Sequence, residues 1–110
     1  MVVLTTVGSE DQGRAIAEAL VEQEIAACVN ILPGLRSIYR WKGKLWDDEE
    51  LLLFIKTTDD AMDAVVATVR ELHSYELPEI LALSVERAET AVLDWLRSSV
   101  RAKPRDRSSD

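Results

Sequence analysis

The chain has one cysteine, Cys28, and one histidine, His73, and these two side chains are its candidates for soft metal ligands. A thiolate and an imidazole together favour copper over a hard cation such as magnesium. A zinc site takes three or four such ligands, and the sequence has no HExxH motif, no CxxC motif and no second histidine. One chain therefore does not supply the ligands of an ordinary zinc site.

Both residues also have plainer interpretations, which the sequence leaves open. Cys28 lies among small apolar residues, where a free cysteine usually behaves as a buried hydrophobic side chain. His73 falls near the predicted end of a helix, where its side chain could hydrogen-bond the last carbonyl groups. A Cys28 nucleophile with His73 as its base would suit hydrolysis, but no third, orienting residue lies at a recognisable spacing.

Charged residues concentrate in two neighbouring segments. The four acidic residues at 47–50 lack the spaced ligands and the glycine of an EF-hand loop, so we interpret them as a solvated connection between strands. The basic residues within 36–44 either pair with this acidic run or form an anion site, and we favour pairing. The aromatic side chains of Tyr39, Trp41 and Tyr75 either line a cleft or contact the core or a second chain.

Composition excludes several classes of function. The chain has 110 residues and a formal net charge of -7, with 13 Lys and Arg against 20 Asp and Glu, so it lacks the basic surface that nucleic-acid binding needs. Its four glycines are scattered and form no phosphate-binding loop. No apolar stretch approaches the roughly 20 residues of a membrane span, and a lone cysteine suits a reducing compartment. We therefore expect a cytoplasmic protein that binds neither nucleic acid nor membranes.

Hydrophobic periodicity predicts the elements that position these residues. Val2–Val7 is a β-branched run typical of a buried strand, and a capping box at 9–12 predicts a helix that runs to about Glu24. Residues 26–32 predict a second strand, which a Pro-Gly pair stops. The strict alternation over 35–45 indicates that an extended strand then resumes.

The second half of the chain predicts the end of a hairpin, followed by a helix, a strand and a last helix. We place the chain reversal at the acidic run 47–50, before an apolar strand over 51–57. A helix follows to about His73, and a strand over 80–85 leads to a last helix, for which Thr90 is the predicted N-cap.

The element order is therefore βαββαβ with an added C-terminal helix. This order predicts an α+β, ferredoxin-like antiparallel sheet with helices on one face. We expect residues 1–101 to form this single domain and the polar residues 102–110 to be a disordered tail. The strand at 51–55 is apolar at five successive positions, although the helices of one chain cover one face only. We therefore expect the chain to form a homo-oligomer that covers the other face.

Six segments of the chain stand in a specific order and spacing. They are AACVN at 26–30, PG at 33–34, SIYRWKGK at 37–44, KTT at 56–58, HSYELPE at 73–79 and LDWL at 93–96. Together they resemble the CutA divalent-cation tolerance family over about residues 2–100. The resemblance implies a cytoplasmic, non-enzymatic homotrimer that gives tolerance to copper and other divalent metals and holds no tightly bound cofactor.

The resemblance also implies a cleft between subunits. Seven residues match the family's motif positions: Cys28, Tyr39, Trp41, Lys56, His73, Tyr75 and Glu79. We assign His73 and Cys28 as candidate metal ligands and the other five to the inter-subunit cleft. Family members proposed to bind copper can have a cysteine where this chain has Thr5 and a second histidine where it has Leu72, so a copper site here has fewer ligands.

The leading expectation is thus a homotrimer that binds copper or another divalent metal without catalysing a reaction. The alternative is a PII-like signalling trimer with an inter-subunit cleft for a small molecule and an unidentified protein partner. An enzyme that uses Cys28 is a third hypothesis.

Overall fold

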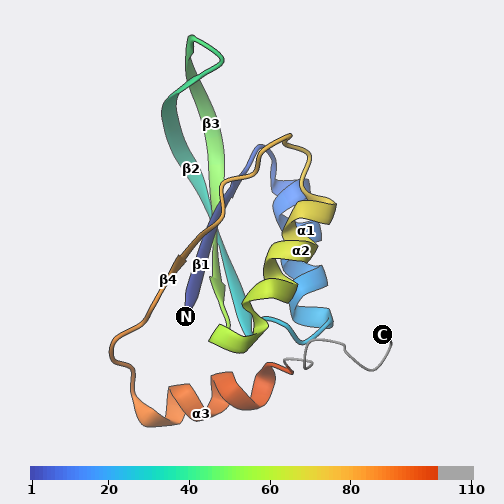
Figure 1. Ribbon diagram of the computed structural model, residues 1–110, viewed down its shortest axis with the longest axis vertical. Helices are drawn as coiled ribbons and strands as arrows, with labels where there is room; N and C mark the ends of the chain where they lie inside the picture. Colours follow the sequence, from blue (N-terminus) through green and yellow to red (C-terminus); the bar gives the residue numbers. More distant parts are fainter. Residues whose placement is uncertain (102–110) are drawn as a thin grey trace.

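The computed structural model describes residues 1–101, and the tail predicted for 102–110 lies outside the described residues. One layer of sheet and one layer of helices make up the body of the chain (Figure 1). Its elements are β1 (Val2–Val7), α1 (Glu10–Glu22), β2 (Cys28–Trp41), β3 (Lys44–Lys56), the 3-10 helix η1 (Asp59–Ala61), α2 (Met62–Leu72), β4 (Leu81–Leu83) and α3 (Thr90–Ser99).

The described strands form one antiparallel sheet in the order β2-β3-β1-β4. Helices α1 and α2 lie together on one side of it, while α3 lies apart (Figure 1). This arrangement confirms the predicted α+β, ferredoxin-like fold with its added C-terminal helix. The last strand is shorter than the predicted 80–85, since the pairing with β1 covers only Leu81–Leu83.

The core forms where the apolar stripes of α1 and α2 meet the helix side of the sheet. Ser9 caps α1 as predicted, because its Oγ accepts a hydrogen bond from the Gln12 backbone N–H at 3.1 Å. The helix ends slightly earlier than expected, and Glu24 beyond it has a φ of 60°. The buried side chains of this core are Val3, Val7, Ile16, Leu20, Ile25, Ala26, Leu53, Ile55, Val65 and Val69.

The predicted position of the hairpin turn is wrong. The chain reverses at Lys42 and Gly43, whose φ angles are 53° and 76°, and Trp41 pairs with Lys44. Two successive left-handed residues are typical of the two-residue turn that matches the twist of a hairpin, and glycine adopts that conformation without strain. The acidic run 47–50 lies within β3, because its members pair with β2 residues instead of joining two strands.

A β-bulge lies between Leu32 and Leu35 of β2. Pro33 is tolerated there because β2 is an edge strand, and Gly34 adopts a φ of 81°. Beyond the bulge, the hairpin extends past the end of β1 as an arm (Figure 1), which we define as residues 35–50.

The face of the sheet opposite α1 and α2 is apolar and open. Side chains alternate along β3, so Leu52 and Phe54 project away from the face that carries Leu53 and Ile55. Strand pairing adds residues from the other three strands to this open face. Its apolar side chains are Val2, Leu4, Leu32, Leu52, Phe54, Leu81 and Leu83.

Helix α3 is amphipathic but packs against little of its own chain. Within residues 1–101 it contributes no buried side chain, and Val92 and Trp95 are about half exposed. The chain returns to the body only after α3, where the Arg101 N–H donates to the Glu24 carbonyl at 2.6 Å. A second apolar surface is therefore left without cover in one chain.

Candidate functional site

His73 lies directly after α2 and is buried against the end of β1. Its Nε2 is 2.7 Å from the carbonyl oxygen of Thr6, and its Nδ1 accepts a hydrogen bond from the Tyr75 backbone N–H at 3.1 Å. A carbonyl oxygen only accepts, so these partners assign a neutral imidazole with its proton on Nε2. The side chain therefore joins α2 to β1 and does not bond the last carbonyls of its own helix.

The Nε2 contact is of a kind that metal-binding histidines also make. A metal-binding imidazole usually donates its second N–H to a carbonyl or carboxylate, which fixes the tautomer and the ring orientation. In His73 the Thr6 carbonyl accepts this hydrogen bond, which leaves Nδ1 as the acceptor nitrogen of the ring. In this structure Nδ1 accepts the hydrogen bond from the Tyr75 backbone N–H.

Gln12 fixes the segment that carries His73. Its Nε2 donates to the Leu72 carbonyl at 3.0 Å, and its Oε1 accepts from the Ser74 N–H at 2.8 Å. The predicted capping box is thus correct for Ser9, whereas the Gln12 side chain bonds the α2 end and not the start of α1. Sequence analysis missed this role because the two contacts span 60 and 62 positions of the chain.

Tyr75 crosses the end of β1 and reaches the arm. Its hydroxyl donates to Glu50 Oε2 at 2.6 Å, and Glu50 is only 5% exposed. Gly8 leaves the room for this, since a Cβ there would lie 3.1 Å from the Tyr75 hydroxyl. Burial, followed by the hydrogen bond to Glu50, raises the pKa of Tyr75 well above the ordinary value.

A second phenol and carboxylate pair lies further along the arm. The Tyr39 hydroxyl donates to Asp48 Oδ2 at 2.5 Å, and the Tyr39 ring stacks on Trp46 with centroids 6.4 Å apart. The hydrogen bond to Asp48, then burial, raises the pKa of Tyr39 to about 12. We call Tyr39, Asp48, Glu50 and Tyr75 the phenol–carboxylate cluster.

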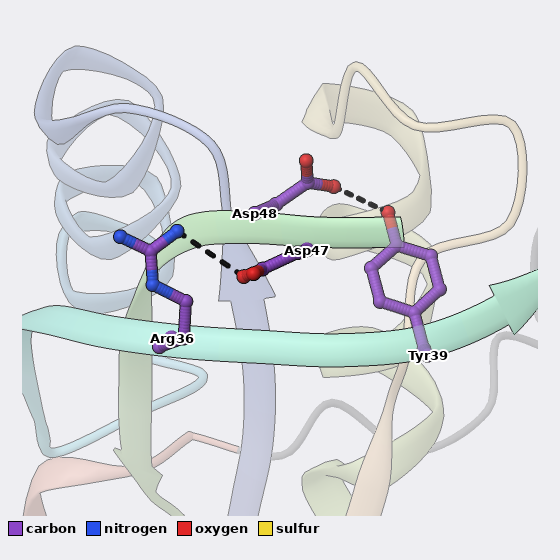
Figure 2. A network of polar contacts seen from close by, with 4 residues as sticks. All are labelled: Arg36, Tyr39, Asp47 and Asp48. Atoms are coloured by element: carbon purple, nitrogen blue, oxygen red, sulfur yellow. Dashed lines mark hydrogen bonds and ion pairs between the residues drawn. The ribbon is translucent and has the colours of Figure 1, made fainter. Parts of the chain in front are cut away.

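Asp47 and Asp48 project to opposite sides of β3 (Figure 2). On the side away from the cluster, Arg36 Nη1 lies 3.2 Å from Asp47 Oδ1. The interpretation that the basic segment pairs with the acidic run is therefore correct for this pair. The role of Asp48 and Glu50 was missed, although their spacing of two from Leu52 already placed them on one face of a strand.

Cys28 and Lys56 lie opposite each other at the far end of the sheet from His73. His73 contacts Thr6, which pairs with Leu52, and Lys56 lies four positions further along β3, or about 13 Å away. Cys28 is half-buried in one chain and lies on the open face, outside the buried core. One chain does not bring Cys28 and His73 together.

The remaining predicted residues also lie apart. Trp41 is at the tip of the arm, where its carbonyl accepts from the Trp46 Nε1–H at 3.0 Å, and Glu79 is exposed in the segment before β4. Among residues 1–101, no three His, Cys, Asp or Glu side chains gather in a group that could hold a metal ion. No helix in the same range is long and apolar enough to cross a membrane.

Known proteins match this chain over nearly its whole described length. The family profile described as "CutA1 divalent ion tolerance protein" matches residues 1–99. The "Divalent-cation tolerance protein CutA" of Thermus thermophilus is 53% identical over 98 residues, which cover 89% of this chain and 95% of that protein. The "Protein CutA 1, chloroplastic" of Oryza sativa subsp. japonica is 40% identical over 92% of this chain, which spans 57% of the rice protein.

A solved structure agrees with the sequence comparison. The divalent cation tolerance protein (Cut A1) from Thermus thermophilus superposes with a TM-score of 0.89 and 52% identity, and covers 91% of this chain and 97% of that structure. Both the fold and the sequence therefore point to the same group of proteins. The chain belongs to the CutA1 divalent ion tolerance family.

Proposed function

We propose that this chain forms a homotrimer that binds a divalent metal ion, with copper as the leading candidate, and acts in metal tolerance without catalysis. The observation that carries the metal proposal is the contact between His73 Nε2 and the Thr6 carbonyl. This contact fixes the proton on Nε2, so a metal would bind at Nδ1 in place of the Tyr75 N–H. Binding is expected to weaken at low pH, because a protonated imidazole is not a ligand.

The open face supports the assembly part of the proposal. Apolar sheet surface of this extent usually marks an interface, and α3 adds a second uncovered apolar stripe. A closed ring of identical chains covers such surfaces without leaving a free end. Family membership favours three copies, in line with the resemblance described above.

Assembly also explains how a metal site is completed in this proposal. Cys28 lies on the open face, so it can approach His73 only from another subunit. We propose Cys28 of a neighbouring subunit as the soft ligand, which would restore the thiolate and imidazole pair that copper favours. Tyr39, Trp41, Lys56, Tyr75 and Glu79 are the residues proposed to line the surrounding cleft.

Calorimetric titration of Cu(II) and Zn(II) tests this proposal. The wild type, His73→Ala and Cys28→Ser are compared, with Glu18→Gln on the outer surface of α1 as the control. We expect both ligand variants to lose at least tenfold in affinity and the control to match the wild type. Equal affinity in wild type and His73→Ala would rule out His73, and light scattering that shows a stable monomer at micromolar concentration would rule out the trimer.

The second candidate is the PII-like signalling trimer with a small-molecule cleft and a protein partner. The phenol–carboxylate cluster supports it, because its two hydrogen-bonded pairs lie close enough to interact electrostatically and together offer two hydroxyls and two carboxylates. A silent metal titration from a protein that is still trimeric would support this candidate over the first. We also propose a cytoplasmic location, which cell fractionation tests; the rice relative's name places that protein in the chloroplast.

A further inference from the structure

Helix α1 and the edge strand β2 border an open groove on the surface of the chain, which we call the α1–β2 groove. It has a volume of about 440 Å³ and is lined by Ala17, Glu18, Val21, Glu22 and Val29. Three of these side chains are apolar, and Val21 is 43% exposed in one chain. The groove therefore offers an apolar contact surface that also carries two carboxylates.

The two carboxylates differ in their partners. Glu18 Oε2 lies 3.5 Å from Arg14 Nη2, one turn earlier on α1. Glu22 is exposed and has no ion-pair partner among residues 1–101. Glu22 is thus the carboxylate of the groove that is available to a cation from outside the chain.

Helix α3 carries an apolar stripe of the kind that binds in such a groove. Val92, Trp95 and Leu96 follow the i, i+3, i+4 spacing that places side chains on one side of a helix, and Val92 and Trp95 are 48% and 49% exposed. Arg97 lies at the border of this stripe, whereas Asp94 lies on the opposite side of the helix. Helices that bind in apolar grooves use anchors at this spacing.

The contacts at both ends of the α3 segment belong to its own chain. Before the helix, β4 pairs with β1 at the sheet edge opposite β2. After the helix, the Arg101 N–H donates to the Glu24 carbonyl at 2.6 Å, and Arg101 Nε lies 3.4 Å from Glu24 Oε1. With its ends held in this way, α3 lies apart from α1 (Figure 1), and no α3 residue lines the groove in the described part of the chain.

We infer that α3 of one subunit binds in the α1–β2 groove of the next subunit. The apolar stripe lies against the apolar side chains of the groove, and Arg97 pairs with Glu22 of the neighbouring subunit. Trp95 and Arg97 are of the residue types that most often dominate the binding free energy of an interface. A helix and a groove are different surfaces, so this contact runs head to tail, as a closed ring of three subunits requires. The inference rests on the proposed function only in that the chain assembles.

Light scattering over a dilution series of the full-length chain tests the apolar part of this contact. The series is run at the lowest urea concentration at which the wild type dissociates measurably. Trp95→Ala should raise the dissociation constant of the assembly roughly tenfold or more, because it removes the largest apolar side chain of α3. Asp94→Ala, on the opposite side of the same helix, is the matched control and should dissociate like the wild type. Circular dichroism of both variants should match the wild type, since Trp95 is already half exposed in one chain.

Charge reversal tests the pairing of Arg97 with Glu22. Arg97→Glu and Glu22→Arg should each raise the dissociation constant about two- to fivefold, because each places like charges at the contact. The double variant should return to the wild-type value, since it restores opposite charges. Single variants that dissociate like the wild type, or a double variant without this recovery, would overturn the pairing.

Disulfide cross-linking tests which surfaces meet. In a Cys28→Ser background, Val21→Cys and Val92→Cys are introduced into separate chains, which are mixed in urea and refolded together. Oxidation should link one chain of each kind into a covalent dimer on a non-reducing gel. Val21→Cys mixed with Asp94→Cys is the control pair and should stay unlinked.

Failure of this contact and failure of the proposed function give different results. A wild type that is monomeric at micromolar concentration contradicts both. If the wild type is trimeric, but Trp95→Ala dissociates like the wild type and the Val21→Cys and Val92→Cys chains do not link, the contact is wrong and the trimer stands.

A truncated chain distinguishes α3 from another occupant of the groove. Residues 102–110 include three basic residues, which also suit the carboxylates of the groove. A chain that ends at Arg101 should assemble and cross-link like the full-length protein. Loss of the Val21–Val92 cross-link in that chain would assign the groove to residues 102–110 and overturn the inference.

Discussion

At the scale of single residues, the buried polar side chains of the fold have unequal partners. Thr57 Oγ1 donates to the Ile25 carbonyl at 2.7 Å, and His73 uses both ring nitrogens. Thr5 differs, because among the described residues its buried Oγ1 has no hydrogen-bond partner. A buried hydroxyl without a partner costs about 1–3 kcal/mol of desolvation free energy.

Replacing this hydroxyl should stabilise the protein. Thr5 is 1% exposed, and Thr5→Val removes an unpaired polar group at nearly constant volume. We expect the free energy of unfolding to rise by about 1 kcal/mol, measured by urea denaturation at fixed protein concentration. Thr57→Val is the matched control and should lower it by about 1 kcal/mol, because the Ile25 carbonyl loses its donor. Loss of stability in Thr5→Val would show that the hydroxyl has a partner.

The two tyrosines should titrate late in the folded protein. The pKa of Tyr39 is raised to about 12, chiefly by its bond to Asp48, and that of Tyr75 is raised chiefly by burial. Tyrosinate absorbance at 295 nm should therefore be nearly absent at about pH 10.5, where the urea-unfolded chain is more than half ionised. Linkage gives the direction in which the free energy of unfolding changes with pH. Both folded-state pKa values lie above the unfolded value, so these bonds contribute fully below about pH 10, and stability falls as the pH rises through the raised values.

Variants identify the two titrations. Tyr75→Phe should leave a single transition near pH 12 from Tyr39. A folded wild type that ionises near pH 10 would contradict the bonds to Asp48 and Glu50.

At the scale of elements, the hairpin decides where the acidic residues point. With the turn at Lys42 and Gly43, Trp46 lies opposite Tyr39, and Asp48 and Glu50 follow on the same face. A turn at 47–50 would have removed all of these carboxylates from the sheet. The phenol–carboxylate cluster thus depends on the conformation of two turn residues.

Gly43→Ala should weaken the arm. The φ of 76° at Gly43 is costly for a residue with a Cβ, so we expect a loss of about 1 kcal/mol in the free energy of unfolding. Lys42→Gly is the control, since Lys42 already has a φ of 53° and glycine relieves that strain. It should equal or exceed the wild type in thermal stability at the same protein concentration. Equal stability of Gly43→Ala and wild type would argue against this turn.

At the scale of the whole molecule, one chain leaves apolar surface exposed to water. The open face and α3 both leave apolar side chains in water, and His73 has no second soft ligand within reach. In the proposed function, assembly covers the open face, covers α3 and brings a second soft ligand to His73.

A charge on the open face should break the assembly without unfolding the subunit. Leu81 is 51% exposed in one chain, so Leu81→Glu should cost the isolated fold little while it buries a charge in the proposed interface. Size-exclusion chromatography with light scattering should show monomers for this variant and trimers for Arg14→Glu, a control on the outer surface of α1. Trimers from Leu81→Glu would mean that this face is not the interface.

The sequence by itself determined the element order, the layer of helices on one face and the apolar character of the central strand on both faces. Hydrophobic periodicity and a helix cap are local signals, and they fixed β1, α1 and α2 to within a few residues. The sequence did not fix the turn at Gly43, because the same residue types occur both in two-residue hairpin turns and in bends within one strand. Only the tertiary structure decided which polar atoms meet. The contacts of Gln12 with Leu72, His73 with Thr6 and Tyr75 with Glu50 join segments far apart in the chain, and no local pattern encodes them.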